Sequence, residues 1–121
     1  MKEVTNWIEK EYLIPIVNVN INISKLLIGK TKDAHSREIV DWFIAKKNET
    51  RNHPILFSGI EILFEPYLKI DPLKIFKQVS RNTTVLVMWP GEYKNDNLSY
   101  ASPEHAHYKT WADPGVEIIQ I

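Results

Sequence analysis

The chain has 121 residues, of which 44% are hydrophobic and 25% are charged, as in an ordinary globular protein. Lys and Arg balance Asp and Glu at 15 each, so no overall positive charge exists to attract nucleic acid. The absence of cysteine excludes disulfides, thiolate metal sites and cysteine nucleophiles. We expect a cytoplasmic protein with a single domain over residues 1–121, and the sequence indicates neither a signal peptide nor a membrane span.

The first half of the chain predicts a short helix, a strand and two further helices. Thr5 partly fits a helix cap, and Pro15 is expected to end that helix. Apolar residues alternate with asparagine over residues 14–21, which predicts a half-buried strand. Two helices are expected within residues 24–47, with Gly29 at the break between them.

The remaining elements alternate between strands and helices. In chain order they are a buried parallel strand at residues 55–58, a helix from Asp71 or Pro72 to Val79, a strand at 83–89, a long polar loop at 92–113 and a final strand at 116–121. This alternation predicts an α/β fold with three layers, in which a mostly parallel sheet is flanked by helices.

Gly29-Lys30-Thr31 has the last residues of a phosphate-binding loop, in which Lys and Thr reach the terminal phosphates and magnesium. That motif also needs a glycine five positions before Gly29, where Ser24 stands, and it should open a helix directly after a buried strand. Residues 25–28 have a helical pattern instead. We therefore interpret Gly29 as the stop of a helix.

The strand at residues 55–58 is placed like the strand that ends in a magnesium-binding acidic residue in nucleotide hydrolases, but here the last residue is Ser58. Serine cannot supply the negative charge, and Ser58 is the candidate cofactor-binding residue at this position. Glu61 and Glu65 follow closely. Glu61 is a candidate catalytic carboxylate, although we favour a solvent-facing or loop role for both residues.

Aromatic residues and lysines are interleaved after residue 88. Arg81, Trp89, Tyr100 and Trp111 are the candidate contacts to a partner protein or a nucleic acid, because such side chains anchor interfaces and stack on bases. We favour the alternative that several of the aromatic side chains cover a sheet edge, where one side is dry and the other wet.

His105 and His107 are separated by one residue, so an extended segment would place both imidazoles on one side, as a transition metal requires. No third ligand is evident in the sequence. We interpret both as solvated loop residues and expect no metal site.

Five stretches carry a resemblance to a known family through their shared order and spacing. They are Ile16–Asn20, Gly59–Phe64, Asp71–Leu73, Ser80–Val85 and Leu98–Pro103. Together they resemble the small P-loop protein of BREX phage-defence systems, the BrxF family. The resemblance extends from about Pro15 to the end of the chain.

The resemblance implies a P-loop ATPase core of AAA+ character with an additional strand, encoded beside a DNA methyltransferase, a helicase and other proteins that block phage replication. In such a core the phosphate loop lies between the first strand and the first helix, so this chain would begin just after it. Asn82 would precede the sensor strand as a catalytic residue, whereas Trp89 would be unsuited to sensing. ATP and Mg²⁺ would be cofactors only if the family activity is retained.

Loss of the first strand would also affect assembly. That strand is expected between the last two strands of this chain, so its absence would leave an unpaired sheet edge, which favours a dimer or a partner.

We therefore expect a component of a BREX-type system that is not catalytic alone and acts through contacts with other phage-defence proteins or with its own copies. Two alternatives stay open. One is an active ATPase whose phosphate loop lies upstream of this chain. The other is a DNA- or RNA-binding module that uses Arg81 and the aromatic loop.

Overall fold

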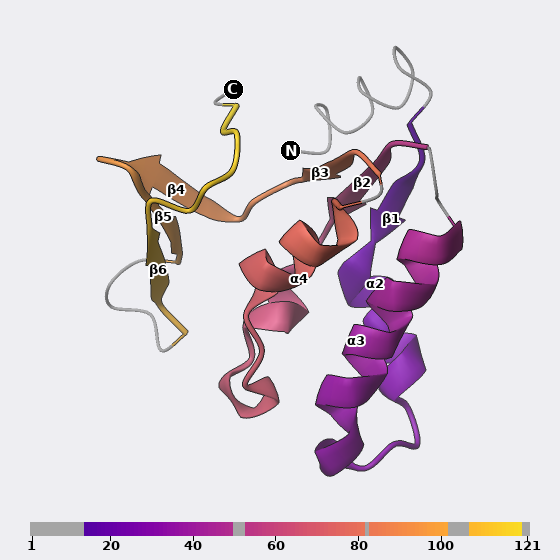
Figure 1. The fold of residues 1–121 in the computed structure, drawn as a ribbon. Coiled ribbons are helices and arrows are strands. Elements are labelled where there is room, and N and C mark those ends of the chain that lie inside the picture. The colour runs from indigo at the N-terminus through magenta and orange to yellow at the C-terminus, as the bar shows by residue number, and fades with distance from the viewer. Residues whose placement is uncertain (1–13, 50–52, 82, 102–106, 120–121) are drawn as a thin grey trace. The chain divides into compact units, whose positions relative to one another are not determined.

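The computed structural model describes residues 14–49, 53–81, 83–101 and 107–119 (Figure 1). The chain divides into two compact units, Met1–Met88 and Trp89–Ile121. The described elements of the first unit are, in chain order, β1 (Ile16–Asn18), α2 (Val19–Leu27), α3 (Lys32–Glu49), β2 (Ile55–Ser58), the 3-10 turns η1 (Glu61–Phe64) and η2 (Pro66–Leu68), α4 (Pro72–Val79) and β3 (Val85–Val87). No helix among the described residues has both the length and the apolar character needed to span a bilayer.

A three-stranded parallel sheet forms the centre of the first unit. Its strand order is β1-β2-β3, so β2 is the middle strand, and Leu56 pairs with Ile16 on one side and with Leu86 on the other. The first three residues of β2 are buried, as a strand between two neighbours requires. This confirms the predicted strand at residues 55–58, while the strand predicted at 83–89 is shorter in the structure.

Helices α3 and α4 pack side by side on one face of this sheet (Figure 1). Phe57 of β2 lies between them, with ring centroids 5.4 Å from Phe43 of α3 and 5.5 Å from Phe76 of α4. Phe43 and Phe76 also meet edge to face at 5.6 Å, a favoured aromatic geometry. The predicted α/β class is therefore confirmed, while helices on the second face of the sheet stay a prediction.

Two helix boundaries predicted from the sequence are confirmed. Gly29 follows α2 with a φ of 79°, a left-handed conformation that glycine adopts without strain. The side chain of Asp71 caps α4 by accepting hydrogen bonds from the backbone N–H groups of Leu73 and Lys74 at 3.1 and 3.3 Å.

The strand predicted over residues 14–21 is wrong beyond Asn18, because Val19 already begins α2. The Asn18 side chain accepts a hydrogen bond from Ile21 N at 2.9 Å and so caps this helix. Val19 and Ile23, four residues apart, are the buried residues of α2. An alternation of apolar residues with asparagine therefore fits two structures, since asparagine is both the polar half of a strand pattern and a strong helix cap.

The second unit is an antiparallel sheet in which β4 (Gly91–Lys94), β5 (Asn97–Tyr100) and β6 (Lys109–Ala112) pair in sequence order. Asn95 and Asp96 join β4 to β5 with φ values of 52° and 62°, as a two-residue type I′ hairpin turn requires. The long loop predicted over residues 92–113 is therefore wrong. The final strand predicted at 116–121 is also wrong for residues 116–119, and the last two residues lie outside the described part.

Candidate functional site

The carboxyl ends of parallel strands are where ligands bind in open α/β sheets, so this edge is the first place to look for a site. β1 ends at Asn18 and β2 ends at Ser58, and these two residues are register partners. Asn20, Gly59 and Glu61 follow directly in the chain. We call these five residues the carboxyl-end cluster.

Gly59 lets the two connections of the cluster approach each other closely. Its φ is 57°, and a Cβ added there would lie 2.8 Å from Asn18 Oδ1 and 2.9 Å from Asn18 Nδ2. A larger residue would therefore displace the side chain that caps α2. Glycine is required here by both the backbone conformation and the available space.

Asn20 joins the start of α2 to the segment after β2. Its backbone N–H donates to Gly59 O at 2.7 Å, and its Oδ1 accepts from Ile62 N at 2.8 Å. Its Nδ2 donates to Glu61 Oε2 at 2.5 Å. Asn20 thus makes two hydrogen bonds to η1 and one to Gly59 just before it, all to residues about 40 positions away in the sequence.

Glu61 is the predicted catalytic carboxylate, and the structure places it at the carboxyl edge of the sheet. It is the first residue of η1, exposed, with one carboxylate oxygen engaged by Asn20 Nδ2. A carboxylate held by a neutral amide is oriented but keeps its second oxygen for another donor. Glu61 therefore helps to hold η1 against α2, and its second carboxylate oxygen can still accept a hydrogen bond from a ligand.

Ser58 lies half-buried at the end of β2, close in sequence to Glu61. Together the cluster offers two amides, a hydroxyl and one carboxylate, which is a hydrogen-bonding surface with little negative charge. Among the residues that the structure describes, no group of three or more His, Cys, Asp or Glu residues is arranged to hold a metal ion. Asn82, the second predicted catalytic residue, and His105 lie outside the described residues.

Gly29-Lys30-Thr31 is at the other end of α2 from the carboxyl-end cluster. The nine residues of α2 separate the two by roughly 13 Å at 1.5 Å per residue. Lys30 lies 3.8 Å from Glu38 of α3 in an ion pair. The motif therefore connects two helices, as predicted from its context.

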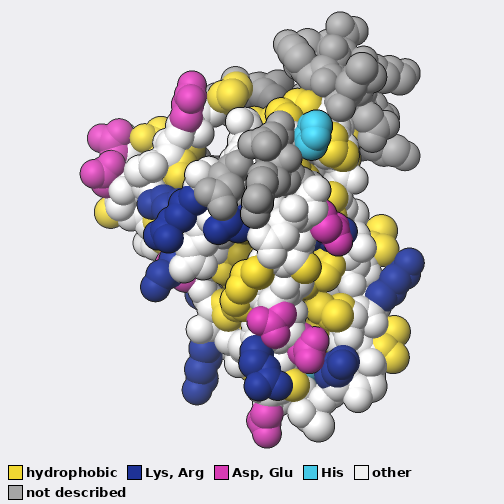
Figure 2. All heavy atoms as spheres, turned by 45° about the vertical axis from the view of Figure 1, so that its right-hand side comes forward, with side chains coloured by type: hydrophobic (Ala, Val, Ile, Leu, Met, Phe, Trp, Pro, Cys, Tyr) yellow, Lys and Arg dark blue, Asp and Glu magenta, His cyan; other side chains and the backbone are white. Residues whose placement is uncertain are grey.

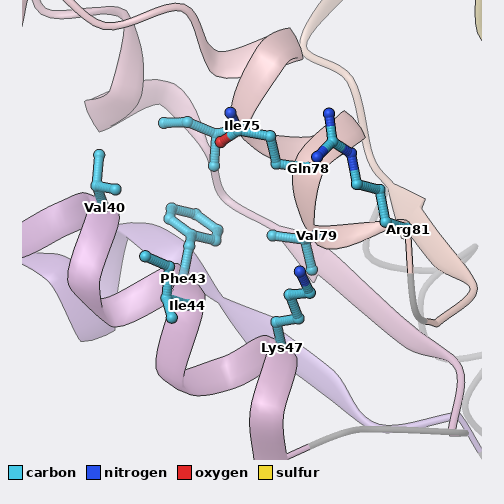
Figure 3. A pocket seen from close by; sticks show the side chains of 8 residues that line it. All are labelled: Val40, Phe43, Ile44, Lys47, Ile75, Gln78, Val79 and Arg81. Carbon is cyan, nitrogen blue, oxygen red and sulfur yellow. The ribbon is translucent and has the colours of Figure 1, made fainter.

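Arg81, a predicted contact residue, follows α4 and lines a pocket of about 210 Å³ between α3 and α4 (Figure 3). Lys47 of α3 lines the same pocket. The sequence indicates Arg81 through its position before a strong strand. Lys47 was not predicted as a contact residue from the sequence, although its spacing of seven residues from Val40 places both on one face of a helix.

The other predicted contact residues, Trp89, Tyr100 and Trp111, belong to the second unit. The rings of Trp89 and Trp111 meet edge to face with centroids 5.3 Å apart, and Trp89 Nε1 donates to Ser99 O at 2.8 Å. Both tryptophans therefore pack within this small sheet. This supports the packing interpretation favoured from the sequence for these two residues.

Tyr93 of β4 has a phenol whose pKa is raised by its surroundings. Burial raises the pKa of the phenol above its ordinary value of 10.0, and the hydrogen bond with Asp96 raises it further. The Tyr93 hydroxyl donates to Asp96 Oδ1 at 3.2 Å across the type I′ turn. The negative charges of Asp96 and Asp113 act in the same direction.

Figure 2 shows one side of the surface, on which charged side chains of both signs are exposed. Lys and Arg side chains lie there in several places, with Asp and Glu side chains between them.

Comparison with protein-family models, with curated proteins and with solved structures finds no match to this chain.

Proposed function

We propose that this chain is a component of a BREX-type phage-defence system that acts through protein contacts and does not hydrolyse ATP by itself. The observation that carries the proposal is the β3 edge of the parallel sheet, which we call the open edge. Within the described residues β3 pairs with β2 alone, so its other edge has no neighbouring strand. An edge of this kind is a template for strand addition by another chain.

The resemblance to the BrxF family adds a second line of support. In that fold the strand before the phosphate loop is expected next to the strand that corresponds to β3. The observed order β1-β2-β3 is compatible with this layout, because β3 is an edge strand. We therefore propose that a β-strand of a partner protein from the same defence system occupies this edge.

Backbone directions identify the groups that would receive that strand. Thr84 O accepts from Ile55 N at 3.0 Å and Met88 N donates to Phe57 O at 2.9 Å, so the peptide groups of both residues face β2. Peptide groups alternate in direction along a strand, so those of Val85 and Val87 face the open edge.

The chemistry of the carboxyl-end cluster supports the non-catalytic part of the proposal. Ser58 brings no negative charge to the end of β2, and the carboxylate of the cluster, Glu61, lies three residues beyond it with one oxygen bound to Asn20 Nδ2. A phosphoryl-transfer site needs a phosphate-binding loop and a carboxylate that holds magnesium. Among the residues that the structure describes, those at this edge supply neither in the form that the P-loop fold uses.

Substitution of Val87 tests the open edge. Val87→Pro removes an outward N–H group, and proline is tolerated on edge strands, so the β2 pairing should survive. Val87→Ile keeps the N–H group and the β-branched shape and is the matched control. We expect Val87→Pro to weaken binding of the partner, measured by co-purification and sedimentation with the other defence proteins, by about tenfold.

Two outcomes would contradict the proposal. One is a homogeneous monomer that binds none of the defence proteins. The other is equal partner affinity for the Val87→Pro and Val87→Ile variants at equal folded fraction, measured by circular dichroism. Self-association of the pure chain that Val87→Pro abolishes would assign the edge to a second copy instead.

The two alternatives from the sequence make different predictions. An ATPase with its phosphate loop upstream predicts an in-frame Gly-x-x-x-x-Gly-Lys-Thr or Gly-x-x-x-x-Gly-Lys-Ser motif before this chain, and DNA sequence checks it. Micromolar binding of Mg–ATP by the isolated chain in calorimetry would overturn the non-catalytic proposal. A nucleic-acid module predicts DNA affinity that falls as salt rises.

A further inference from the structure

The pocket between α3 and α4 lies within the first unit and differs from the carboxyl-end cluster in its composition. Residues at helical spacing on α3 and α4 form its walls. Its apolar lining includes Phe43 and Ile44 of α3 and Ile75 and Val79 of α4, as Figure 3 shows. Ile44 is 51% exposed, so about half of its side-chain surface is accessible to an occupant of the pocket.

Two cations complete the pocket. Lys47 extends from α3 and Arg81 from the segment after α4, and no Asp or Glu is among the lining residues. Within the described part of the chain, neither cation has an ion-pair partner, whereas Lys30 pairs with Glu38 and Lys46 pairs with Glu49. The pocket thus has an apolar lining and uncompensated positive charge.

We propose that this pocket binds an acidic peptide segment of a partner protein. One large apolar side chain of the segment fills the pocket, and neighbouring carboxylates of the segment bind Lys47 and Arg81 at its rim. Arginine suits this task because its guanidinium group can donate two parallel hydrogen bonds to one carboxylate.

The size of the pocket favours a single peptide side chain over a whole small molecule. Its volume of about 210 Å³ is below the range of roughly 300–1,000 Å³ that is typical of small-molecule sites. It is sufficient for one side chain of the size of Leu or Phe. Recognition by a single anchoring side chain with flanking charges is a common mode of peptide binding.

The lining also argues against a nucleic acid as the occupant. A nucleic acid presents a row of phosphates and needs several cations along its path. Here two cations flank an apolar surface, and the chain as a whole has no net charge. An acidic peptide satisfies both the apolar and the charged parts of the pocket.

Methyl-detected NMR titration of the full chain tests the proposal. The probe is the acetylated and amidated peptide Asp-Glu-Leu-Phe-Glu-Asp, and the control peptide has Ser-Ser in place of Leu-Phe. We expect the methyl resonances of Val40, Ile44, Ile75 and Val79 to shift with a sub-millimolar Kd for the probe and to stay unchanged for the control peptide.

Two substitutions test the charges of the pocket, a third tests its apolar lining, and a fourth is the control. Lys47→Gln and Arg81→Gln should each weaken binding about fivefold, as expected for partly exposed ion pairs. Ile44→Asp places a carboxylate at the pocket and should abolish binding, and the exposure of Ile44 makes this variant compatible with folding. Lys77→Gln, an equal charge change on α4 outside the pocket, is the matched control and should leave Kd unchanged.

The proposal is overturned if the probe causes no methyl shifts at millimolar concentration, or if Lys77→Gln weakens binding as much as Lys47→Gln. Methyl shifts caused by a single-stranded oligonucleotide and not by the peptide would assign the pocket to nucleic acid and would also overturn it. Val87→Pro is expected to leave peptide binding unchanged, so failure of this proposal and failure of the open-edge proposal are distinguishable.

Discussion

Asn20 offers the sharpest test of how the carboxyl-end cluster is held together. Asn20→Ala removes the hydrogen bond from Ile62 N at 2.8 Å and the one to Glu61 Oε2, while its own backbone N–H still reaches Gly59 O. The substitution should loosen η1 and release the Glu61 carboxylate. It therefore measures the structural task of the predicted catalytic residue.

The size of the effect follows from the two lost bonds. The bond to Ile62 N is neutral and part-buried and contributes about 1 kcal/mol. The bond to Glu61 involves a charge but lies at an exposed site, so we assign it about 1 kcal/mol rather than the larger value of a buried charged pair. Alanine gains about 0.5 kcal/mol of helix propensity over asparagine. The expected loss of unfolding free energy is therefore about 1.5 kcal/mol.

Urea denaturation measures this loss, with Asn22→Ala as the matched control. Asn22 lies in the same helix and its side chain donates one hydrogen bond, to Asn18 O at 2.8 Å, so the propensity change is the same in both variants. In a double-mutant cycle, Asn20→Ala and Glu61→Ala should show a coupling energy of about 1 kcal/mol. If Asn20→Ala and Asn22→Ala agree within about 0.3 kcal/mol, the proposed role of Asn20 is refuted.

Two further predictions concern the second unit. Gly91→Ala should unfold the antiparallel sheet, because an added Cβ would lie 1.8 Å from Ser99 O. The comparison variant is Gly29→Ala in the first unit, where an added Cβ meets no atom within 4 Å and should cost only the ~1 kcal/mol of left-handed backbone strain. Tryptophan fluorescence and thermal unfolding distinguish the two outcomes. Ultraviolet titration should show Tyr93 ionising above the ordinary pKa of 10.0, and Asp96→Asn should lower that pKa; an unchanged titration in this variant would contradict the assigned cause. Because the pKa is raised in the folded state, the stability linked to Tyr93 is present below about pH 10. It is lost as the pH rises through the folded-state pKa.

The sequence predicts the elements of the first unit best where local signals are strong. The apolar run at residues 55–58, the Asp71 cap and the Gly29 stop each depend on interactions within a few residues, and all three are confirmed. The candidate site is predicted less well. Glu61 was identifiable as a carboxylate near a strand end, but its partner Asn20 is 41 residues away, and no local pattern connects them.

The strands of the second unit show a different limit. β4 and β6 are mostly exposed, and each has one or two half-buried residues among polar ones. Polar strands of this kind resemble loops in composition, because their stability comes from cross-strand pairing such as Leu98 opposite Trp111 rather than from intrinsic preference. The register that creates these pairs is a tertiary property.

The order of the parallel strands and the composition of the carboxyl-end cluster are likewise tertiary. The sequence by itself determined the α/β class, the balance of charge and the absence of cysteine chemistry. Periodicity is a property of short segments and composition a property of the whole chain, so neither depends on which distant segments come into contact. Only the tertiary structure decided that Asn20 holds Glu61 and that Lys47 and Arg81 line one pocket. Each of these depends on contacts between segments that are distant in sequence. A short stretch of sequence does not predict such contacts.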